Sequence, residues 1–342
     1  MAIIKKPSDH PYFPLKPKIG VLLVNLGTPD GTDYWSMRKY LKQFLMDRRV
    51  VDIFKPLWWL ILNGPILTFR PSKSGKAYEK IWDKDNYGSP LRKHTVNQTK
   101  KLQELYKQDK QIIIEHAMRY GKPEIDKTLY KMKENGCTKI VLMPLYPQYA
   151  ASTSATVKDE VFKWLLEQRW QPDIRTISPW FDDSNYIKAL ANTIKDNLKN
   201  KTKPDMLLIS FHGIPKRYFM AGDPYHCHCI KTSRLLKQEL KWPEDKILVT
   251  FQSRFGPEPW LQPYTDKTII DLAKNGIKNI AVVAPGFISD CLETLEELNV
   301  EARELFIENG GQNFEYIPCL NDNKHSIKLL NQIIKTNLLG WV

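Results

Sequence analysis

Eight short segments of the chain are rich in apolar and β-branched residues and have the length of β-strands. They form two sets of four, at 19–25, 111–117, 139–143 and 173–177, and then at 206–211, 246–251, 279–284 and 314–317. Near-continuous apolar runs of this kind are typical of parallel strands that are buried on both faces. The pattern therefore predicts two four-stranded parallel sheets.

Segments with the apolar spacing of amphipathic helices lie between these strands, at 33–46, 91–106, 124–134 and 233–240. A strand that alternates with a helix indicates βαβ units, in which helices flank the faces of a parallel sheet. We therefore expect an α/β protein that consists of two doubly wound domains.

Three short motifs of the first half recur in the second half in the same order. LLVNLGTP (22–29) matches LLISFHGIP (207–215), RYG (119–121) matches RFG (254–256), and NGCTKI (135–140) matches NGIKNI (275–280). Such a repeat indicates a duplicated domain. The first match needs one inserted residue, and His212 occurs only in the second half, so the duplicated scaffold does not itself require this histidine.

We expect the two domains to span 17–178 and 179–321 and to face each other across a cleft. A C-terminal helical segment, 322–342, is expected to pack back on the first domain. Unusual motifs follow six of the strands, at 25–30, 118–123, 144–149, 210–215, 252–259 and 285–293. Ligands of open α/β sheets bind beyond the carboxyl ends of the strands, so these motifs should line the cleft.

His212 and a row of glutamates are the main candidates for chemistry in this cleft. The segment 285–297, PGFISDCLETLEE, should open a helix with Ser289 as its N-cap. Glu293, Glu297 and Glu301 then follow at intervals of four residues, which places their carboxylates on one helix face. The alternatives are an imidazole that only bonds nearby backbone and a glutamate face that is merely solvated, although Glu293 fits the second alternative poorly.

An imidazole and a carboxylate suit a borderline divalent metal such as Fe²⁺ or Zn²⁺. Two ligands are too few for a tight structural site, and this suits a metal that is bound transiently. Aromatic and cationic residues are frequent in the same motifs: Tyr120, Tyr146, Tyr149, Phe211, Phe255, Trp260 and Phe287, with Arg70, Arg119 and Arg254. A cleft lined by aromatic and cationic side chains fits a flat apolar ligand that carries carboxylate substituents.

Composition narrows the possible partners. The chain has 342 residues and a formal net charge of +13, but its lysines are scattered and no nucleic-acid-binding motif is present. We therefore expect no nucleic-acid partner. The charge suits an acidic small molecule or an anionic membrane surface equally well.

The five cysteines and the lack of a signal peptide predict a reducing, cytoplasmic location. Residues 1–18 are polar and rich in proline, which predicts a loose arm. The apolar segment 56–69 is broken at 63–65 and is too short to span a bilayer. Its residues Trp58 and Trp59 leave two alternatives open, burial in the core or peripheral contact with the inner face of the membrane.

The motifs closely resemble one known family. LLISFHGIPKRYFMAGDPY (207–225) is similar to the signature of the ferrochelatases, and VLLVNLGTPD, MRYGKP, PLYPQYAAST, FQSRFGPEPW and PGFISDCLETLEE follow the order of that family's motifs. The resemblance implies a lyase that inserts Fe²⁺ into protoporphyrin IX to form protohaem and releases two protons, the last step of haem biosynthesis. It also implies a chelatase-like fold of two Rossmann-like domains with the active site between them.

The resemblance assigns roles to individual residues. His212 and Glu293 match the family's paired metal-binding and catalytic residues, and His212 is the better base because imidazoles exchange protons near neutral pH. Glu297 and Glu301 would extend a metal or proton path behind Glu293. The segment at about 55–70 matches an apolar lip over the pocket. The positions that match porphyrin-binding residues are Leu26, Arg70, Arg119, Tyr120, Tyr146 and Phe287.

The chain departs from some members of the family in its cysteines. Ala150 and Ala151 follow the PQY motif where those members have a cluster ligand, and residues 340–342 contain no cysteine. We therefore expect no iron–sulfur cluster and no cofactor, with Fe²⁺ as a substrate. Cys291 also replaces a histidine that some members have two positions before the glutamate.

Two questions stay open at this point. The run from His226 to Cys229 holds four good metal ligands, but neither a helix nor a strand would turn all four toward one ion. We favour a structural role for this run. Other possible functions are a tetrapyrrole carrier and a chelatase for another tetrapyrrole or for cobalt. Coproporphyrin is an alternative substrate, although 285–297 is more similar to the protoporphyrin group.

Overall fold

The computed structural model describes residues 16–84 and 86–342, so most of the predicted N-terminal arm lies outside the described residues. Two parallel sheets form its framework, in the orders β2-β1-β3-β4 and β6-β5-β7-β8. The strands are β1 (Lys18–Thr28), β2 (Ile112–Gly121), β3 (Cys137–Pro144), β4 (Asp173–Thr176), β5 (Met206–His212), β6 (Ile247–Gln252), β7 (Asn279–Val283) and β8 (Asn313–Ile317). The equivalent strand orders confirm the predicted α/β fold of two duplicated, Rossmann-like halves.

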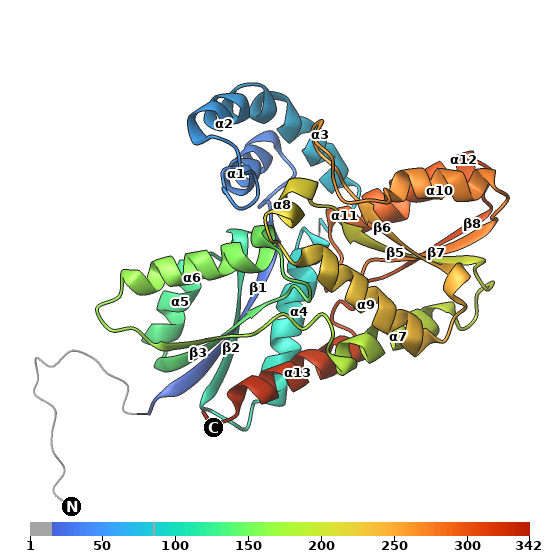
Figure 1. Ribbon diagram of the computed structural model, residues 1–342. Helices are drawn as coiled ribbons and strands as arrows, with labels where there is room; N and C mark the ends of the chain where they lie inside the picture. Colours follow the sequence, from blue (N-terminus) through green and yellow to red (C-terminus); the bar gives the residue numbers. More distant parts are fainter. Residues whose placement is uncertain (1–15, 85) are drawn as a thin grey trace, which may run out of the picture.

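Helices cover both faces of each sheet (Figure 1). The outer faces carry α5 (Ile125–Glu134) and α6 (Thr156–Leu166) in the first half, and α10 (Thr265–Lys274) and α12 (Arg303–Glu308) in the second. Between the sheets lie α4 (Pro90–Leu105), α7 (Ser184–Leu198), α9 (Tyr225–Leu240) and α13 (Lys324–Leu338).

One hydrophobic core joins the two halves. It contains Leu23 of the first sheet, Leu207 of the second, and Leu236 and Leu330 of the helices between them, all fully buried. The C-terminal helix α13 contacts α4 and β3 of the first half as well as α7. The core is therefore continuous, and the domain bounds at 178 and 321 stay predictions.

β1 and β2 run further than predicted, to Thr28 and Gly121, so that Leu26, Arg119 and Tyr120 lie inside strands and not in the loops beyond them. The two strands stay paired because Gly27 has no side chain. A Cβ at Gly27 would lie 1.7 Å from the backbone oxygen of Tyr120, and its φ of +108° also favours glycine.

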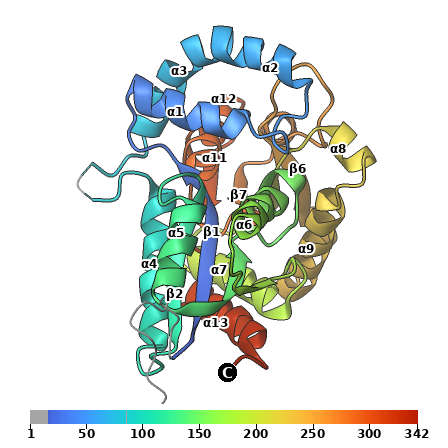
Figure 2. The ribbon, with the colours of Figure 1, turned by 90° about the vertical axis from the view of Figure 1, so that its left-hand side faces the viewer.

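An arch of helices lies over the carboxyl ends of the strands (Figure 2). It consists of α1 (Tyr34–Leu45), α2 (Lys55–Ile61), the π-helix η1 (Leu62–Ile66) and α3 (Leu67–Glu79). Trp58 is buried in this arch and donates from Nε1 to the backbone oxygen of Leu45 at 2.7 Å, whereas Trp59 is half exposed. In the described ranges no helix has both the length and the apolarity needed to cross a bilayer.

Replacement of Leu330 by alanine should lower the free energy of unfolding by about 2–5 kcal/mol, because the change leaves a cavity in the shared core. Urea denaturation followed by circular dichroism measures this, and the control Lys328→Ala on the exposed face of α13 should change the value by less than about 0.5 kcal/mol. We expect one cooperative transition. Two transitions, with only one of them shifted, would contradict a continuous core.

Candidate active site

His212 is the last residue of β5, and its imidazole is partly exposed at the carboxyl edge of the second sheet. Its Nδ1 lies 2.6 Å from the backbone oxygen of Gly213. A carbonyl oxygen only accepts hydrogen bonds, so in the neutral imidazole Nδ1 carries the proton and Nε2 carries the lone pair. The Phe287 ring lies edge-on to the imidazole at a centroid distance of 6.5 Å. Nε2 is therefore the atom that can accept a proton or bind a metal.

Gln252 connects His212 with the helix that carries Glu293. It ends β6, pairs with His212 in the sheet, and its backbone oxygen accepts from the N–H of Gly213 at 2.7 Å. Its side-chain Nε2 donates to the backbone oxygen of Glu293 at 2.6 Å, while Oε1 accepts from the Ser210 hydroxyl at 2.8 Å. The buried amide thus holds both predicted catalytic residues to one strand end.

The N-cap of the helix α11 (Leu292–Leu295) is Cys291, so the predicted N-cap at Ser289 is wrong. Cys291 Sγ accepts from the backbone N–H of Thr294, and the Thr294 hydroxyl accepts from the N–H of Cys291 at 3.0 Å. Ser289 instead accepts a hydrogen bond from Gln98 of α4 at 3.2 Å. Burial, together with the nearby Glu293 carboxylate, raises the pKa of the Cys291 thiol, which therefore stays protonated.

Asp290 fixes the loop that leads into α11. Its buried carboxylate accepts hydrogen bonds from the hydroxyls of Tyr316 (2.5 Å) and Thr294 (3.0 Å) and from Nδ2 of Asn321 (2.6 Å). The backbone oxygen of Asn321 in turn accepts from Nε2 of Gln98 at 2.6 Å. Several hydrogen-bond donors offset the cost of burying the Asp290 carboxylate. Because Gln98 belongs to α4, the same network anchors the loop to the first half.

The prediction that one regular α-helix carries Glu293, Glu297 and Glu301 is wrong. After α11 the chain forms the π-helix η4 (Glu297–Ala302), in which the N–H of Glu301 donates to the oxygen of Glu296 at 2.9 Å. Glu301 is exposed and Glu297 points inward. Glu297 nevertheless lies close enough to Glu293 and Glu301 for both carboxylates to affect its titration, so the three remain neighbours.

Glu297 is the most perturbed carboxyl group of this region. Burial raises its pKa to about 8, and the Glu293 carboxylate adds to the effect, while a hydrogen bond from the Ser253 hydroxyl opposes it. Ser253 adopts a left-handed backbone with φ of +58°, an uncommon conformation for a residue with a side chain. Glu297 therefore holds a proton at neutral pH.

Aromatic side chains of the first half lie near the start of α11. Burial raises the pKa of Tyr146, and its hydroxyl has no hydrogen-bond partner among the described residues. Tyr120 donates from its hydroxyl to Asp47 at 2.8 Å. Leu26 packs with Tyr120 in the apolar cluster under the arch, and this cluster also touches Leu292 beside Glu293. Of the expected aromatic residues, Phe211 is instead fully buried in the shared core.

The predicted arginines have different surroundings. Arg119 is nearly buried and bound to Asp47 at 2.5 Å and to the Thr156 hydroxyl at 2.6 Å. Arg70 lies over the Phe255 ring at 4.9 Å, and within the described ranges it forms no ion pair. Burial lowers the pKa of Arg70, an effect that the nearby Glu297 partly offsets. Arg70 is thus a cation beside Glu297 that has no ion pair among the described residues.

The run from His226 to Cys229 lies in the first turn of α9, and its side chains diverge. His228 accepts a hydrogen bond from the Tyr149 N–H at 3.1 Å and stacks on Phe181, while His226 stacks on Phe251. Cys229 is buried, whereas Cys227 is exposed. In the described ranges no group of three or more metal-ligating side chains converges on one point.

Sequence reasoning missed four residues of this region. Gln252 follows a predicted strand, as His212 does, and that position could have revealed it. Asp290 is a charged residue at the start of the predicted helix, which was a weaker signal. Tyr40 and Tyr78 lie in α1 and α3, and nothing in the sequence separates them from ordinary core aromatics.

The sequence profile of the ferrochelatase family matches residues 18–338. A ferrochelatase of Allorhizobium ampelinum is 54% identical over 337 residues and covers 98% of both chains. A ferrochelatase of Rhizobium meliloti is 54% identical over 326 residues, with 95% of this chain and 96% of the relative covered. A ferrochelatase of Brucella ovis is 49% identical over 327 residues, with 95% and 93% covered.

Solved structures share the fold at low sequence identity. SirB from Bacillus subtilis with Fe³⁺ matches with a TM-score of 0.56 and 12% identity, over 95% of this chain and 97% of that one. CbiX, the terminal enzyme for biosynthesis of sirohaem in denitrifying bacteria, matches with a TM-score of 0.52 and 12% identity, over 93% and 98%. The fold predicted as chelatase-like is therefore confirmed. The family profile and the relatives show that the chain belongs to the ferrochelatase family, the lyases that insert Fe²⁺ into protoporphyrin IX in haem synthesis.

Proposed function

We propose that His212 is the base of metal insertion and also a transient metal ligand. A porphyrin loses two pyrrole protons as Fe²⁺ enters, so a base must reach the macrocycle nitrogens. The observation that carries this assignment is the bond of Nδ1 to the Gly213 carbonyl, which leaves the Nε2 lone pair free at the strand end. The same lone pair can bind a proton or a cation, but only one at a time.

Glu293 is proposed as the second ligand, which brings Fe²⁺ to the porphyrin. Its backbone is fixed by Gln252, and it lies between the aromatic residues of the first half and the inward-facing Glu297. Glu301 is exposed, so Glu301, Glu297 and Glu293 form a series of carboxylates from the surface inward. A cation that reaches Glu297 displaces its proton, which couples metal entry to proton release.

The proposed porphyrin site uses Leu26, Tyr120, Tyr146 and Phe287 as walls. The unpartnered Tyr146 hydroxyl supports this, because a buried hydroxyl without a partner is costly unless a ligand or water satisfies it. We propose Arg70 as the cation for a porphyrin carboxylate, since it has no ion pair in the described ranges. Arg119 would have to leave Asp47 for such a contact, and we propose that it holds the Tyr120 ring, which lies 4.5 Å from its guanidinium.

We further propose that the enzyme uses Fe²⁺ as its substrate and needs no iron–sulfur cluster or other cofactor. Ala150 and Ala151 replace a possible cluster ligand after Tyr149. The free cysteines are also spread over several elements, with Cys137 in β3 and Cys291 at the start of α11.

The lip is proposed to contact the membrane surface from the cytoplasmic side. Phe54, Leu57 and Leu60 are 74%, 52% and 63% exposed, on and just before α2. Exposed lysines, Lys55 and Lys73, flank them. An apolar surface with basic neighbours suits the interface of an anionic bilayer, from which an apolar porphyrin can enter the site.

Anaerobic mixing of the protein with protoporphyrin IX and Fe²⁺ or Zn²⁺ tests these roles. Catalytic conversion of the absorption spectrum is expected; a one-to-one shift without turnover would indicate a carrier. His212→Ala should lower kcat by about 10²–10⁴-fold, because it removes the proposed base and metal ligand, and it should retain porphyrin binding, because it leaves the proposed porphyrin-binding residues in place. Glu293→Gln should also lower kcat strongly, and Glu297→Gln less. Substantial turnover by His212→Ala would remove this residue from the mechanism.

Glu297 should make the wild-type protein less stable as the pH rises from about 5 to about 8. Its pKa is raised from 4.5 to about 8 in the folded state, so in this range the folded chain keeps a proton that the unfolded chain releases. Glu297→Gln should lose this part of the pH dependence. Urea denaturation at several pH values measures it, and parallel curves for the two proteins would contradict the raised pKa.

Leu57→Gln combined with Leu60→Gln should weaken binding to vesicles that contain phosphatidylserine, because it removes apolar area from the lip. The control is Leu166→Gln, which alters a leucine that is 83% exposed on α6. Co-sedimentation with vesicles measures the bound fraction. Equal binding by the lip variant, the control and the wild type would show that the lip is not the contact surface.

A further inference from the structure

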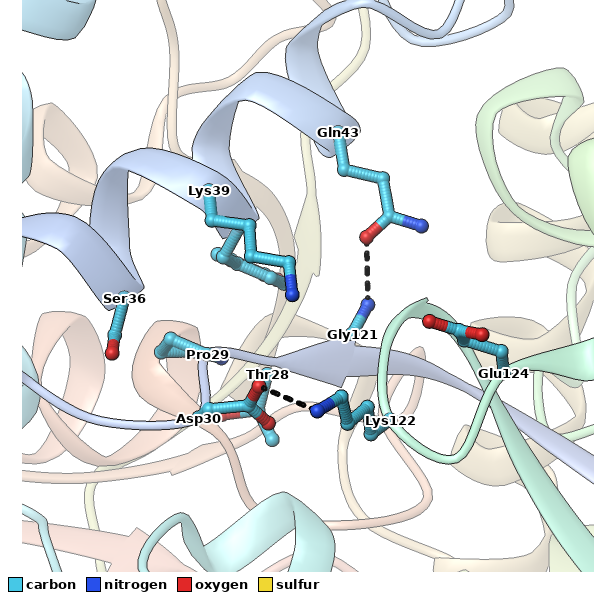
Figure 3. Close-up of a pocket in the computed structure, with 10 residues that line it drawn as sticks. Thr28, Pro29, Asp30, Ser36, Lys39, Gln43, Gly121, Lys122 and Glu124 are labelled. Carbon is cyan, nitrogen blue, oxygen red and sulfur yellow. Dashed lines mark hydrogen bonds and ion pairs between the residues drawn. The ribbon is translucent and has the colours of Figure 1, made fainter.

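The last turn of α1 holds the end of β2, the strand that carries Tyr120. Figure 3 shows Gln43 of α1, whose Oε1 accepts a hydrogen bond from the backbone N–H of Gly121 at 2.9 Å. The Phe44 ring lies edge-on to the ring of Tyr120, with a centroid distance of 5.0 Å. The arch is therefore attached to the strand end that supplies one of the proposed walls of the porphyrin site.

Asp47, just after α1, strengthens this attachment with both oxygens of its carboxylate. Oδ2 accepts from the Tyr120 hydroxyl at 2.8 Å, from Nη2 of Arg119 at 2.5 Å and from the Thr156 hydroxyl. Oδ1 accepts from the backbone N–H of Arg49 at 2.8 Å. The side chains of Asp47 and Arg119 are each 10% exposed, so salt screens this ion pair only weakly. Asp47 thus joins Tyr120 to the chain that leads into α2.

The other end of this chain, the segment 47–52, contacts the second half of the protein. The Tyr218 hydroxyl of α8 (Lys216–Met220) donates to the backbone oxygen of Val50 at 3.1 Å and accepts from the N–H of Asp52 at 3.1 Å. The Tyr218 ring packs against the core that the two halves share. One phenol therefore fixes two backbone groups of the segment to α8.

α8 starts four residues after His212, and the chain between them is held in place. The N–H of Lys216 donates to the backbone oxygen of Pro259 at 2.9 Å, which fixes the start of α8 to the loop that follows β6. β6 itself pairs with β5 up to His212. A continuous series of contacts therefore leads from His212 through Tyr218 to the segment 47–52.

We propose that the segment 47–52 is a clasp that holds Tyr120 in a set position relative to His212, with Asp47 and Tyr218 as its positioning residues. The inference rests on the proposed roles of Tyr120 as a porphyrin wall and of His212 as the base. A porphyrin is a stiff macrocycle that must contact the wall on the first half and the base on the second half at the same time. Small errors in the position of reacting groups lower the rate strongly, so a contact that ties the two halves together near the lip serves the reaction.

The clasp acts on the porphyrin and not on the metal. Gln252 holds His212 and Glu293 together within the second half, and this link does not involve the first-half wall. Loss of the clasp should therefore weaken porphyrin binding and leave metal binding unchanged. A role in folding alone would lower the stability or the active fraction of the protein and would change neither KM.

Tyr218→Phe tests the clasp, because it removes the hydroxyl and keeps the ring. In a steady-state assay with protoporphyrin IX and Zn²⁺, we expect the KM for porphyrin to rise at least about threefold and the KM for Zn²⁺ to stay unchanged. Asp47→Asn replaces an accepting oxygen by an amide group that only donates, and it should raise the porphyrin KM at least as much.

Each variant has a matched control. Tyr106→Phe removes a partly buried hydroxyl that donates to Asn331 at 2.8 Å, between α4 and α13. Asp159→Asn removes the partner of Arg49, an ion pair between the segment 47–52 and α6 in which both side chains are more than 40% exposed. Exposed pairs of this kind contribute little, so both controls should keep the wild-type KM values.

A porphyrin KM equal to that of its control, in either Tyr218→Phe or Asp47→Asn, would overturn the clasp, and so would an equal rise in the KM for Zn²⁺. Circular dichroism checks that each variant is folded, and Tyr218→Phe decides alone where Asp47→Asn does not fold. Tyr120→Leu, measured in the same assay, separates this result from a failure of the proposed function. A raised porphyrin KM in Tyr120→Leu beside an unaffected Tyr218→Phe removes only the clasp, whereas an unchanged KM in Tyr120→Leu removes Tyr120 from the porphyrin site.

Discussion

The hydrogen bond from Gln252 Nε2 to the backbone oxygen of Glu293 joins the end of a strand to the start of a helix. Because Gln252 also pairs with His212 through the sheet, one buried residue sets the relative position of His212, the proposed base, and Glu293, the proposed metal ligand. A displacement of either residue by about 1 Å would separate the two groups that we propose act on one macrocycle. The Asp290 network supports the same helix from the other side and ties it to α4. Backbone hydrogen bonds and buried polar side chains thus hold His212 and Glu293 in place.

The ionisable groups near Glu293 differ in their protonation. Glu297 is protonated at neutral pH, and Tyr40 and Tyr78 are neutral, so Glu293 is surrounded mainly by groups that can donate hydrogen bonds. A protonated Glu297 reduces the mutual repulsion that a row of ionised carboxylates would create. The π-helix η4 contributes by turning Glu297 inward while Glu301 stays in solvent.

The two halves share one fold but contribute different residues to the site. Both sheets have the same strand order, yet only β5 ends in a histidine, and only the second half continues into a glutamate helix. The first half supplies the aromatic wall and the arch, and its Gly27 lets β1 and β2 remain paired up to the site. A shared core fixes the two halves together, so that groups from both can contact one ligand.

The sequence by itself determined the strands, the parallel sheets, the duplication and the candidate pair His212 and Glu293, because apolar periodicity and strand-end motifs are local properties. It could not show the π-helix, the cap at Cys291 or the role of Gln252, since these depend on hydrogen bonds between distant segments. It also could not separate Arg119, which is bound to Asp47, from Arg70, which forms no ion pair with any described residue. Burial and ion pairing arise only when the chain is folded, and for this reason the tertiary structure alone decided which side chains are free to act.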